Sequence, residues 1–339
     1  MKAAHIYGPR DIQVKDIPVP ELTPGTVKVK VEFAGICGSD MHEYLAGLYP
    51  IRKQPVLGHE FSGVVTEIGE GVEGIMVGDR VAVEPVVPCG RCANCRRGLS
   101  HLCSNSQGYG YSMSGGFAEY AVVKQENVFV LPDHMSLELG ALVEPTAVAV
   151  HAVRQSQLKL GDTAAIFGAG PIGLLLLQAV KAAGAGRIIV VEVSDERRAK
   201  ALELGATHVI NPVETDAVQT IREMTKGGAD VAYDAAGVQA TFESGVSVVR
   251  PGGEFKIISL WEKPVTFNPS VIVKSEAKIS GSYAYNNLFP EVISLLASGA
   301  IDGNKVITSM IALDDIVEKG FEQLTQDRKQ CKILVNMNL

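Results

Sequence analysis

The pattern of hydrophobic and polar positions changes once along the chain. Up to about Pro132, short stretches that alternate or run apolar are separated by glycines and prolines, which is typical of β-strands. The predicted strands are Asp11–Ile17, Thr26–Phe33, Gly63–Ile68, Asp79–Val83 and Phe117–Val123. Short strands at this spacing favour a barrel-like or sandwich-like unit.

From about Leu142, apolar strands alternate with segments of helical length, such as Ile172–Ala183 and Asp195–Leu204. The predicted strands are Thr163–Phe167, Arg187–Glu192, Thr207–Ile210, Asp230–Asp234, Glu254–Leu260 and Lys278–Ser282. Six strands with intervening helices predict a doubly wound parallel sheet of the Rossmann type.

After Tyr285 the pattern predicts two further helices, about Leu288–Ser298 and Leu313–Thr325, and a last strand, Cys331–Val335. Because the six-strand sheet is complete without them, we expect this tail to return to the first domain. The predicted fold is therefore α/β with two domains. Residues 1–149 and 285–339 are expected to form a β-rich domain, and residues 150–284 the Rossmann domain.

Length and composition agree with this division. A chain of 339 residues is too long for one ordinary core, so two domains are expected. A net charge of −7 argues against a nucleic-acid-binding surface, which needs a basic face. The longest apolar candidate, Ile172–Ala183, is interrupted by Gln178 and Lys181 and is too short to span a membrane. The N-terminus has no secretory apolar core, so a cytoplasmic location is expected.

A glycine-rich motif indicates a dinucleotide site. Gly168, Gly170 and Gly173, with Pro171 and Ile172 between the last two, follow a predicted strand and open a predicted helix. The glycines permit a tight turn, close approach of the backbone to a pyrophosphate, and close packing of helix on strand. The alternative is a plain glycine-rich turn, but the context is right on both sides.

An acidic residue favours NAD over NADP. Glu192 comes nineteen residues after Gly173, at the end of the second strand, where a carboxylate binds ribose hydroxyls and repels a 2′-phosphate. The alternative is a solvated carboxylate at the end of a strand. Arg197 and Arg198 follow closely, and each is interpreted either as an adenosine contact or as part of a solvated helix face.

Four of the six cysteines form a tight cluster. Cys89, Cys92, Cys95 and Cys103 are separated by two, two and seven residues, which lets their thiolates converge on one tetrahedral zinc ion. Because protein atoms fill all four positions, this pattern predicts a closed, structural site. His101 lies inside the loop and is interpreted as a bystander.

A second set of possible ligands is dispersed. Cys37, His59, Glu60 and Glu144 are acceptable zinc donors, and catalytic zinc needs three protein ligands with one open position. Taken singly, a cysteine is usually an apolar filler, a histidine a satisfied core residue, and Glu144 a carboxylate at a helix start. Spacing alone does not bring these residues together.

In combination, the motifs resemble those of the zinc-dependent medium-chain alcohol dehydrogenases. The segments Gly35–Asp40 (GICGSD) and Gly58–Glu60 (GHE), the four-cysteine lobe and Gly168–Gly173 occur in the family's order. The resemblance covers essentially the whole chain. It implies a barrel-like, GroES-like catalytic domain with a structural zinc lobe, joined to a Rossmann domain that binds NAD.

The resemblance also implies roles for individual residues. Cys37, His59 and Glu144 would hold the catalytic zinc, Glu60 would be an alternating ligand or a neighbour of the metal, and Ser39 and His42 would carry the proton. Glu144 stands where animal alcohol dehydrogenases have a cysteine, as in polyol and butanediol dehydrogenases. Gly38 stands where many members have a basic residue on the pyrophosphate.

The implied reaction is hydride transfer between NAD and an alcohol or ketone. The segments Gly140–Pro145, Val191–Ser194 and Ser259–Pro264 resemble the 2,3-butanediol dehydrogenase branch, which implies interconversion of butanediol and acetoin. The polyol (sorbitol) and threonine dehydrogenase branches are the next alternatives. A zinc-free reductase would lack Cys37, His59 and the lobe. A non-enzymatic binding protein would need more basic charge around the lobe than Arg91, Arg96 and Arg97 supply.

A homo-oligomer is expected as well. The last strand of the Rossmann sheet, Lys278–Ser282, is predicted to lie at an exposed edge, which invites pairing with another chain. The resemblance implies dimers or tetramers formed about a two-fold axis. Val271, Ile272 and Val273 either close that interface or pack inside the monomer.

Overall fold

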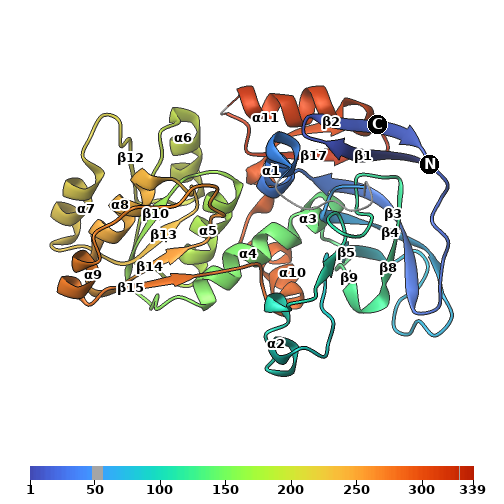
Figure 1. The fold of residues 1–339 in the computed structure, drawn as a ribbon, viewed down its shortest axis with the longest axis horizontal. Helices are drawn as coiled ribbons and strands as arrows, with labels where there is room; N and C mark the ends of the chain where they lie inside the picture. Colours follow the sequence, from blue (N-terminus) through green and yellow to red (C-terminus); the bar gives the residue numbers. More distant parts are fainter. Residues whose placement is uncertain (48–55, 328) are drawn as a thin grey trace. The chain divides into compact units, whose positions relative to one another are not determined.

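The computed structural model describes residues 1–47, 56–327 and 329–339, and the chain divides into two units (Figure 1). Unit 1 consists of Met1–Glu144, Phe289–Gly299 and Gly303–Leu339. Unit 2 consists of Pro145–Leu288 and Ala300–Asp302. These boundaries lie within a few residues of the predicted domain limits at 149/150 and 284/285; the roles assigned to the two domains remain a proposal.

The main sheet of unit 1 has seven strands in the order β16-β17-β3-β4-β5-β9, with β8 also paired to β3. Their bounds are β3 Thr26–Gly35, β4 Glu60–Ile68, β5 Arg80–Val83, β8 Tyr120–Lys124, β9 Val128–Val130, β16 Ile307–Ala312 and β17 Lys332–Asn336. Alternation explains the longest strand, because Val27, Val29 and Val31 all point into the core. The C-terminal strand β17 pairs antiparallel with β3, so segments about 300 residues apart in the sequence share one sheet.

Smaller elements complete unit 1. Strands β1 (Lys2–Gly8) and β2 (Asp11–Asp16) form an antiparallel pair, and β6 (Val86–Val87) pairs with β7 (Gln107–Gly108). Its helices are α1 Gly38–Ala46, α2 Ala93–Arg96, α3 Leu137–Ala141, α10 Phe289–Ala297 and α11 Gln323–Gln326. The single helix predicted over Leu313–Thr325 is instead a succession of 3-10, π and α turns.

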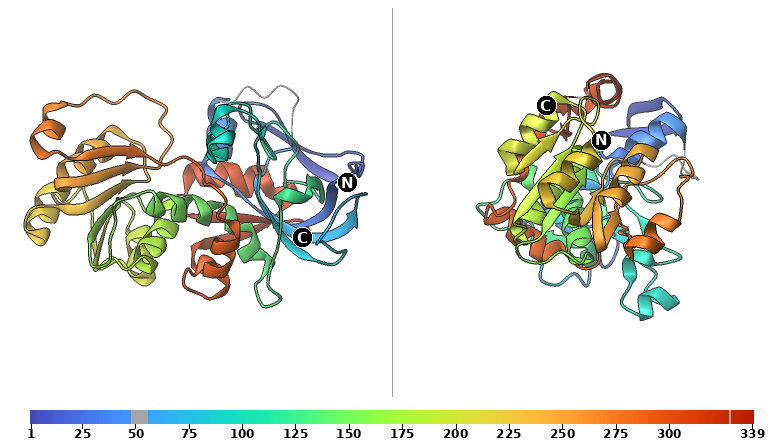
Figure 2. Two further views of the ribbon diagram at one scale, coloured as in Figure 1. Left: turned by 90° about the horizontal axis from the view of Figure 1, so that it is seen from below. Right: turned by 90° about the vertical axis from the view of Figure 1, so that its left-hand side faces the viewer.

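Unit 2 is built on a six-stranded sheet in the order β12-β11-β10-β13-β14-β15, with every neighbouring pair parallel (Figure 2). The strands are β10 Thr163–Phe167, β11 Arg187–Val191, β12 His208–Ile210, β13 Ala229–Asp234, β14 Val249–Ile257 and β15 Lys278–Gly281. In chain order this is 3-2-1-4-5-6, the order of a dinucleotide-binding sheet. The predicted fold class, a Rossmann sheet with a separate β-rich domain, is confirmed.

The helices of unit 2 are α4 Val143–Arg154, α5 Pro171–Ala182, α6 Asp195–Leu204, α7 Ala217–Thr225, α8 Gln239–Val248 and α9 Ser270–Ser275, of which α4 begins in unit 1. After their first residues, strands β10 and β11 are apolar and buried because both faces of a parallel sheet are covered. The topological switch point lies between β10 and β13, since the chain leaves β10 in opposite directions on the two sides. In the part of the chain that the structure describes, no helix is both long and apolar enough to cross a membrane.

Candidate metal and cofactor sites

The four-cysteine lobe brings its thiols together around one point. The Cys92 and Cys95 sulfurs lie 3.5 Å apart, and those of Cys92 and Cys103 lie 3.8 Å apart. The donor atoms of these cysteines and Cys89 all lie within 4.8 Å of one another. A tetrahedral zinc ion with Zn–S bonds of about 2.3 Å places its sulfurs about 3.8 Å apart. The donor set therefore fits a closed zinc site.

The lobe also favours a thiolate before any metal is considered. The backbone N–H groups of Cys95 and Ser104 lower the pKa of Cys92 to about 5. Desolvation and then the hydrogen bond with Cys92 raise the pKa of Cys95 to about 12. Four thiolates so close together repel one another, so full ionisation requires a cation among them.

A second cluster forms where β3 and β4 meet. Gly35 at the end of β3 pairs in register with Glu60 at the start of β4, and Cys37 is the N-cap residue of α1. This pairing brings residues over twenty positions apart side by side. Donor atoms of Cys37, His59 and Glu60 lie within 4.8 Å of one another, and the His59 and Glu60 side chains are buried.

Asp40 organises this second cluster and had no predicted role. One of its carboxylate oxygens accepts the Cys37 N–H at 3.0 Å, and the other lies 3.4 Å from Nδ1 of His59. Burial alone would lower the pKa of His59, but the charges of Asp40 and Cys37 raise it well above its usual value. With Nδ1 turned toward Asp40, Nε2 is the nitrogen left for a metal. The signal in the sequence was the capping position of Asp40, three residues after Cys37.

The carboxylate of Glu60 is held by a lysine that the sequence did not indicate. The Lys332 ammonium lies 2.8 and 2.5 Å from the two Glu60 oxygens and donates to the Ile36 carbonyl at 3.1 Å. Both side chains are at most 1% exposed. Burial opposes the charge on Lys332, but the Glu60 and Cys37 charges outweigh it, and the pKa of Lys332 is raised.

Glu144 lies near this cluster without joining it. It is a buried residue in the first turn of α4, and its charge raises the pKa of both Tyr111 and Lys332. Among the described residues, however, the group with mutually close donor atoms contains Cys37, His59 and Glu60 and not Glu144.

The two residues predicted to carry a proton lie on α1, and both are half-buried. The Ser39 hydroxyl lies 3.5 Å from Nε2 of His59. His42 follows three residues later, on nearly the same face of the helix.

Tyr111 is a further residue of the cluster that sequence reasoning missed. Its hydroxyl lies 3.3 Å from the Ser39 hydroxyl, and its ring stacks on the His59 ring with centroids 4.5 Å apart. Burial, followed by the charges of Cys37 and Glu144, raises the pKa of Tyr111 well above its usual value, so the hydroxyl stays protonated. Its signal was the glycine-rich segment around it, because Gly110 packs directly on Gly58 where no Cβ fits.

In unit 2, the glycine-rich motif has the geometry expected of a phosphate-binding turn. Gly168 has φ of 97°, Gly170 is the N-cap of α5, Pro171 is its first residue and Ile172 its second. A Cβ at Gly173 would lie 2.0 Å from the Gly168 carbonyl oxygen, so only glycine fits. The N-terminus of a twelve-residue helix therefore meets an open turn at the C-terminal end of β10.

Glu192 is joined to this turn. Its carboxylate accepts the N–H of Ala169 at 2.7 Å and that of Ser194 at 3.0 Å. The Arg198 guanidinium donates to the Glu192 and Val193 carbonyls and pairs with Asp195. Arg197 contributes its backbone N–H to the Ser194 cap of α6. Arg198 is therefore committed to the strand end, and the acidic group remains at the turn.

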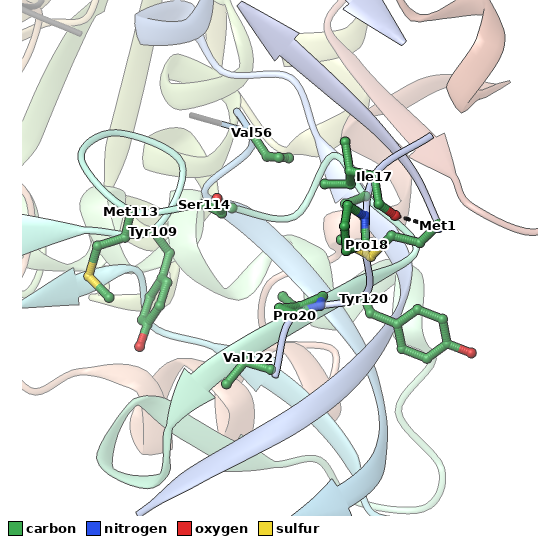
Figure 3. Close-up of a pocket in the computed structure, with 13 residues that line it drawn as sticks. Met1, Ile17, Pro18, Pro20, Val56, Tyr109, Met113, Ser114, Tyr120 and Val122 are labelled. Atoms are coloured by element: carbon green, nitrogen blue, oxygen red, sulfur yellow. Dashed lines mark hydrogen bonds between the residues drawn. The ribbon is translucent and has the colours of Figure 1, made fainter. Parts of the chain in front are cut away.

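A pocket of about 140 Å³ in unit 1 lies apart from these residues. Figure 3 shows its mostly apolar lining, which includes Met1, Ile17, Tyr109 and Met113 but none of the candidate metal ligands. The Tyr109 hydroxyl accepts the N–H of Lys124 at 2.9 Å. The pocket therefore does not bear on the assignment of the metal sites.

Family models match both parts of the chain. One described as "Alcohol dehydrogenase GroES-like domain" matches residues 23–133, and one described as "Zinc-binding dehydrogenase" matches residues 171–298. The chain belongs to the zinc-dependent medium-chain alcohol dehydrogenase family.

Individual relatives match over the full length. The chain is 46% identical to the (R,R)-butanediol dehydrogenase of Bacillus subtilis (strain 168), covering 100% of both chains. It is 39% identical to the sorbitol dehydrogenase of the same organism, covering 100% of this chain and 98% of that one. The crystal structure of 2R,3R-butanediol dehydrogenase from Bacillus subtilis is similar with a TM-score of 0.93, 44% identity and 99% coverage of both chains.

Proposed function

We propose that this protein is a zinc- and NAD-dependent dehydrogenase that interconverts 2,3-butanediol and acetoin. The observation that carries this proposal is the full-length similarity to a butanediol dehydrogenase, together with both metal-ligand clusters and the dinucleotide turn. The substrate is a small alcohol, diol or ketone.

Cys37, His59 and Glu144 are proposed to hold the catalytic zinc, and Cys89, Cys92, Cys95 and Cys103 the structural zinc. Glu60 lies with Cys37 and His59, but each of its two oxygens accepts a hydrogen bond from the Lys332 ammonium. This engagement supports Glu144 as the third resting ligand and Glu60 as the residue that exchanges with it. The catalytic zinc would supply Lewis-acid activation of the substrate oxygen.

The protein's own groups move the proton. Ser39 lies beside the metal-facing nitrogen of His59, so its hydroxyl is placed to accept the proton of the alcohol. His42, one turn further along α1, takes it toward solvent. The ring of Tyr111 packs on His59 and keeps that histidine in one orientation.

Gly168, Gly170, Pro171, Ile172 and Gly173 are proposed to bind the NAD pyrophosphate through the backbone and the N-terminus of α5. Glu192 would accept hydrogen bonds from the adenosine ribose, and Arg197 would lie against the adenosine. Because Arg198 is engaged at the strand end, NAD is favoured over NADP. The nicotinamide would supply the hydride acceptor.

The assembly is proposed to be a homo-oligomer, a dimer or a tetramer, and the location the cytoplasm. Strand β15 is an edge strand of the sheet, and Val271 and Val273 beside it are exposed at 41% and 77%. Ile272 differs, because it packs against the core of unit 2. The six free cysteines agree with a reducing compartment.

Formation of NADH tests the function. Purified protein should reduce NAD with 2,3-butanediol, and kcat/KM for that substrate should exceed those for sorbitol and threonine. A chelator should abolish turnover, and zinc should restore it. Higher kcat/KM for sorbitol would move the protein to the polyol branch. Turnover that resists complete metal removal would indicate a zinc-free reductase, and no turnover with any of these substrates would reject the proposal.

A further inference from the structure

The Tyr111 hydroxyl lies at the border of the metal-ligand cluster. It lies 3.3 Å from the Ser39 hydroxyl, which itself lies 3.5 Å from Nε2 of His59. Ser39 thus borders the metal-ligand cluster, and Tyr111 borders Ser39. A substrate oxygen placed beside Ser39 therefore has the Tyr111 hydroxyl, 3.3 Å from the Ser39 hydroxyl, as a second neighbouring group of the protein.

The backbone around Tyr111 is fixed. The N–H groups of Tyr111, Ser112 and Met113 all donate to the Gly108 carbonyl, at 3.0–3.2 Å. The Gly110 N–H donates in turn to the Met113 carbonyl at 2.8 Å. The turn fixes the backbone of Tyr111, and stacking on His59 orients its ring. A binding group preorganised in this way loses little entropy when it meets its ligand.

A vicinal diol and the corresponding hydroxyketone both carry a second oxygen next to the reacting one. Burying that oxygen without a partner costs free energy, so a site selective for such molecules needs a group to receive it. A tyrosine hydroxyl both donates and accepts, so it serves a neighbouring hydroxyl and a neighbouring carbonyl equally.

We infer that Tyr111 recognises the second oxygen of a vicinal diol or α-hydroxyketone and thereby determines specificity against simple secondary alcohols. This inference rests on the proposed function, and it names the residue that narrows the substrate from alcohols in general to diols. Ser39 serves the reacting oxygen, and Tyr111 serves its neighbour.

The test compares Tyr111→Phe with wild type on two substrates that differ by one oxygen, 2,3-butanediol and 2-butanol. Phenylalanine keeps the ring that stacks on His59 and removes only the hydroxyl. We expect kcat/KM for the diol to fall roughly 10- to 100-fold further than kcat/KM for 2-butanol, which also reports any indirect effect through Ser39. Acetoin and 2-butanone should show the same contrast in the reverse direction. The ratio of the kcat/KM values for the two substrates, measured on one preparation, is independent of the fraction of active enzyme.

Tyr109→Phe is the matched control. Tyr109 lies two residues away, and its hydroxyl accepts the N–H of Lys124 rather than contacting the metal-ligand cluster. The Tyr109→Phe variant should keep the wild-type preference for 2,3-butanediol over 2-butanol, even if its melting temperature falls.

Three results would overturn the inference. In the first, the Tyr111→Phe variant keeps the wild-type preference for 2,3-butanediol over 2-butanol. In the second, it loses activity equally on both substrates, which would make Tyr111 a positioning residue for Ser39 or His59. In the third, the wild-type enzyme itself does not prefer 2,3-butanediol to 2-butanol. Wild-type activity decides the proposed function separately, since an enzyme that oxidises butanediol can still show any of these results for Tyr111.

Discussion

At the scale of single residues, Glu192 connects two parts of the cofactor site. Its carboxylate accepts one N–H from the glycine-rich turn, at Ala169, and one from the end of the next strand, at Ser194. The same group that would receive the ribose hydroxyls therefore also holds the phosphate-binding turn in place. A single carboxylate would thus contribute to the proposed affinity for NAD as well as to the shape of the turn.

Replacing Glu192 should narrow the preference for NAD. Glu192→Ala removes an acceptor for the ribose and a charge that repels a 2′-phosphate, so the ratio of kcat/KM for NAD to that for NADP should fall about tenfold or more. Glu192→Gln, which keeps an acceptor for the Ala169 N–H, should separate the loss of charge from the loss of the turn.

Glu196→Ala is the control for the cofactor measurement. Glu196 is an acid in the first turn of α6 whose carboxylate accepts the Ser194 hydroxyl, so its removal changes the local charge while the Glu192 carboxylate stays in place. The ratio of kcat/KM for NAD to that for NADP in the Glu196→Ala variant should stay close to the wild-type ratio. Wild-type activity with NADP equal to or above that with NAD would contradict the prediction and direct attention to Arg197.

Residue-level chemistry was predictable where ligands lie close in sequence or carry a recognisable motif. The spacing of Cys89–Cys103 sufficed for the lobe, whereas Cys37 and His59 needed the family resemblance. Lys332 and Tyr111 were missed because their partners lie 272 and 72 residues away, and neither residue type stands out locally. Pairing of β17 with β3 and of β3 with β4 creates the contact of Lys332 with Glu60, and no short pattern encodes it.

At the scale of elements, the four-cysteine lobe buries little apolar surface, so its thiols are the main groups available to stabilise it. Helix α2 has four residues, η1 (Ser100–Leu102) has three, and neither contains a buried residue. Leu99 and Leu102 are exposed rather than packed. A segment with so little buried apolar surface depends on a cross-link or a metal for its fold.

Cys92→Ser should therefore cost both a metal ion and stability. We expect metal analysis to fall from two zinc ions per chain to one, and the melting temperature to drop by more than about 5 °C, because the metal's binding free energy is folding free energy. Cys331→Ser is the control, since Cys331 belongs to neither ligand group, and it should keep both ions. Two zinc ions in Cys92→Ser, or fewer than two in wild type grown with zinc, would contradict this.

Element boundaries show which physical signals the sequence carries. Strands β10 and β13 begin and end within one residue of prediction because apolar runs and turn residues bracket them. Strand β14 begins at Val249 rather than Glu254, since Pro251, Gly252 and Gly253 have the composition of a turn yet continue the strand through an irregular register with β13. Helix α1 was not predicted, because its start is defined by Cys37 and Asp40 rather than by apolar periodicity.

At the scale of the whole molecule, the chemistry is divided between the two units. Unit 1 contains both groups of proposed metal ligands, and unit 2 contains the glycine-rich turn and Glu192, the proposed dinucleotide site. Hydride transfer needs the substrate and the cofactor together, so neither unit alone is expected to be active. The full-length match to the Bacillus subtilis relative agrees with this expectation, because it includes both units.

Assembly is the last property to follow from the whole molecule. Strand β15 is the last strand of the six-stranded sheet, so its outer edge is unpaired. Val273, which is 77% exposed, lies in α9 just before this strand. We expect light scattering at micromolar concentration to give two or four times the chain mass of 36.1 kDa. Val273→Glu should shift that mass toward the monomer, because it adds a charge to the proposed interface. Ile279 is a poorer site for a charge, since it packs on the core of unit 2.

Val213→Glu is the control, because Val213 is 80% exposed and follows β12 at the opposite edge of the same sheet. It should leave the mass unchanged. A wild-type monomer would reject assembly through β15, and dissociation by Val213→Glu but not by Val273→Glu would move the interface to the β12 edge. An unchanged oligomer in both variants would exclude either sheet edge as the main contact, because a buried, unpaired charge at an interface costs several kcal/mol, on the order of 2–5.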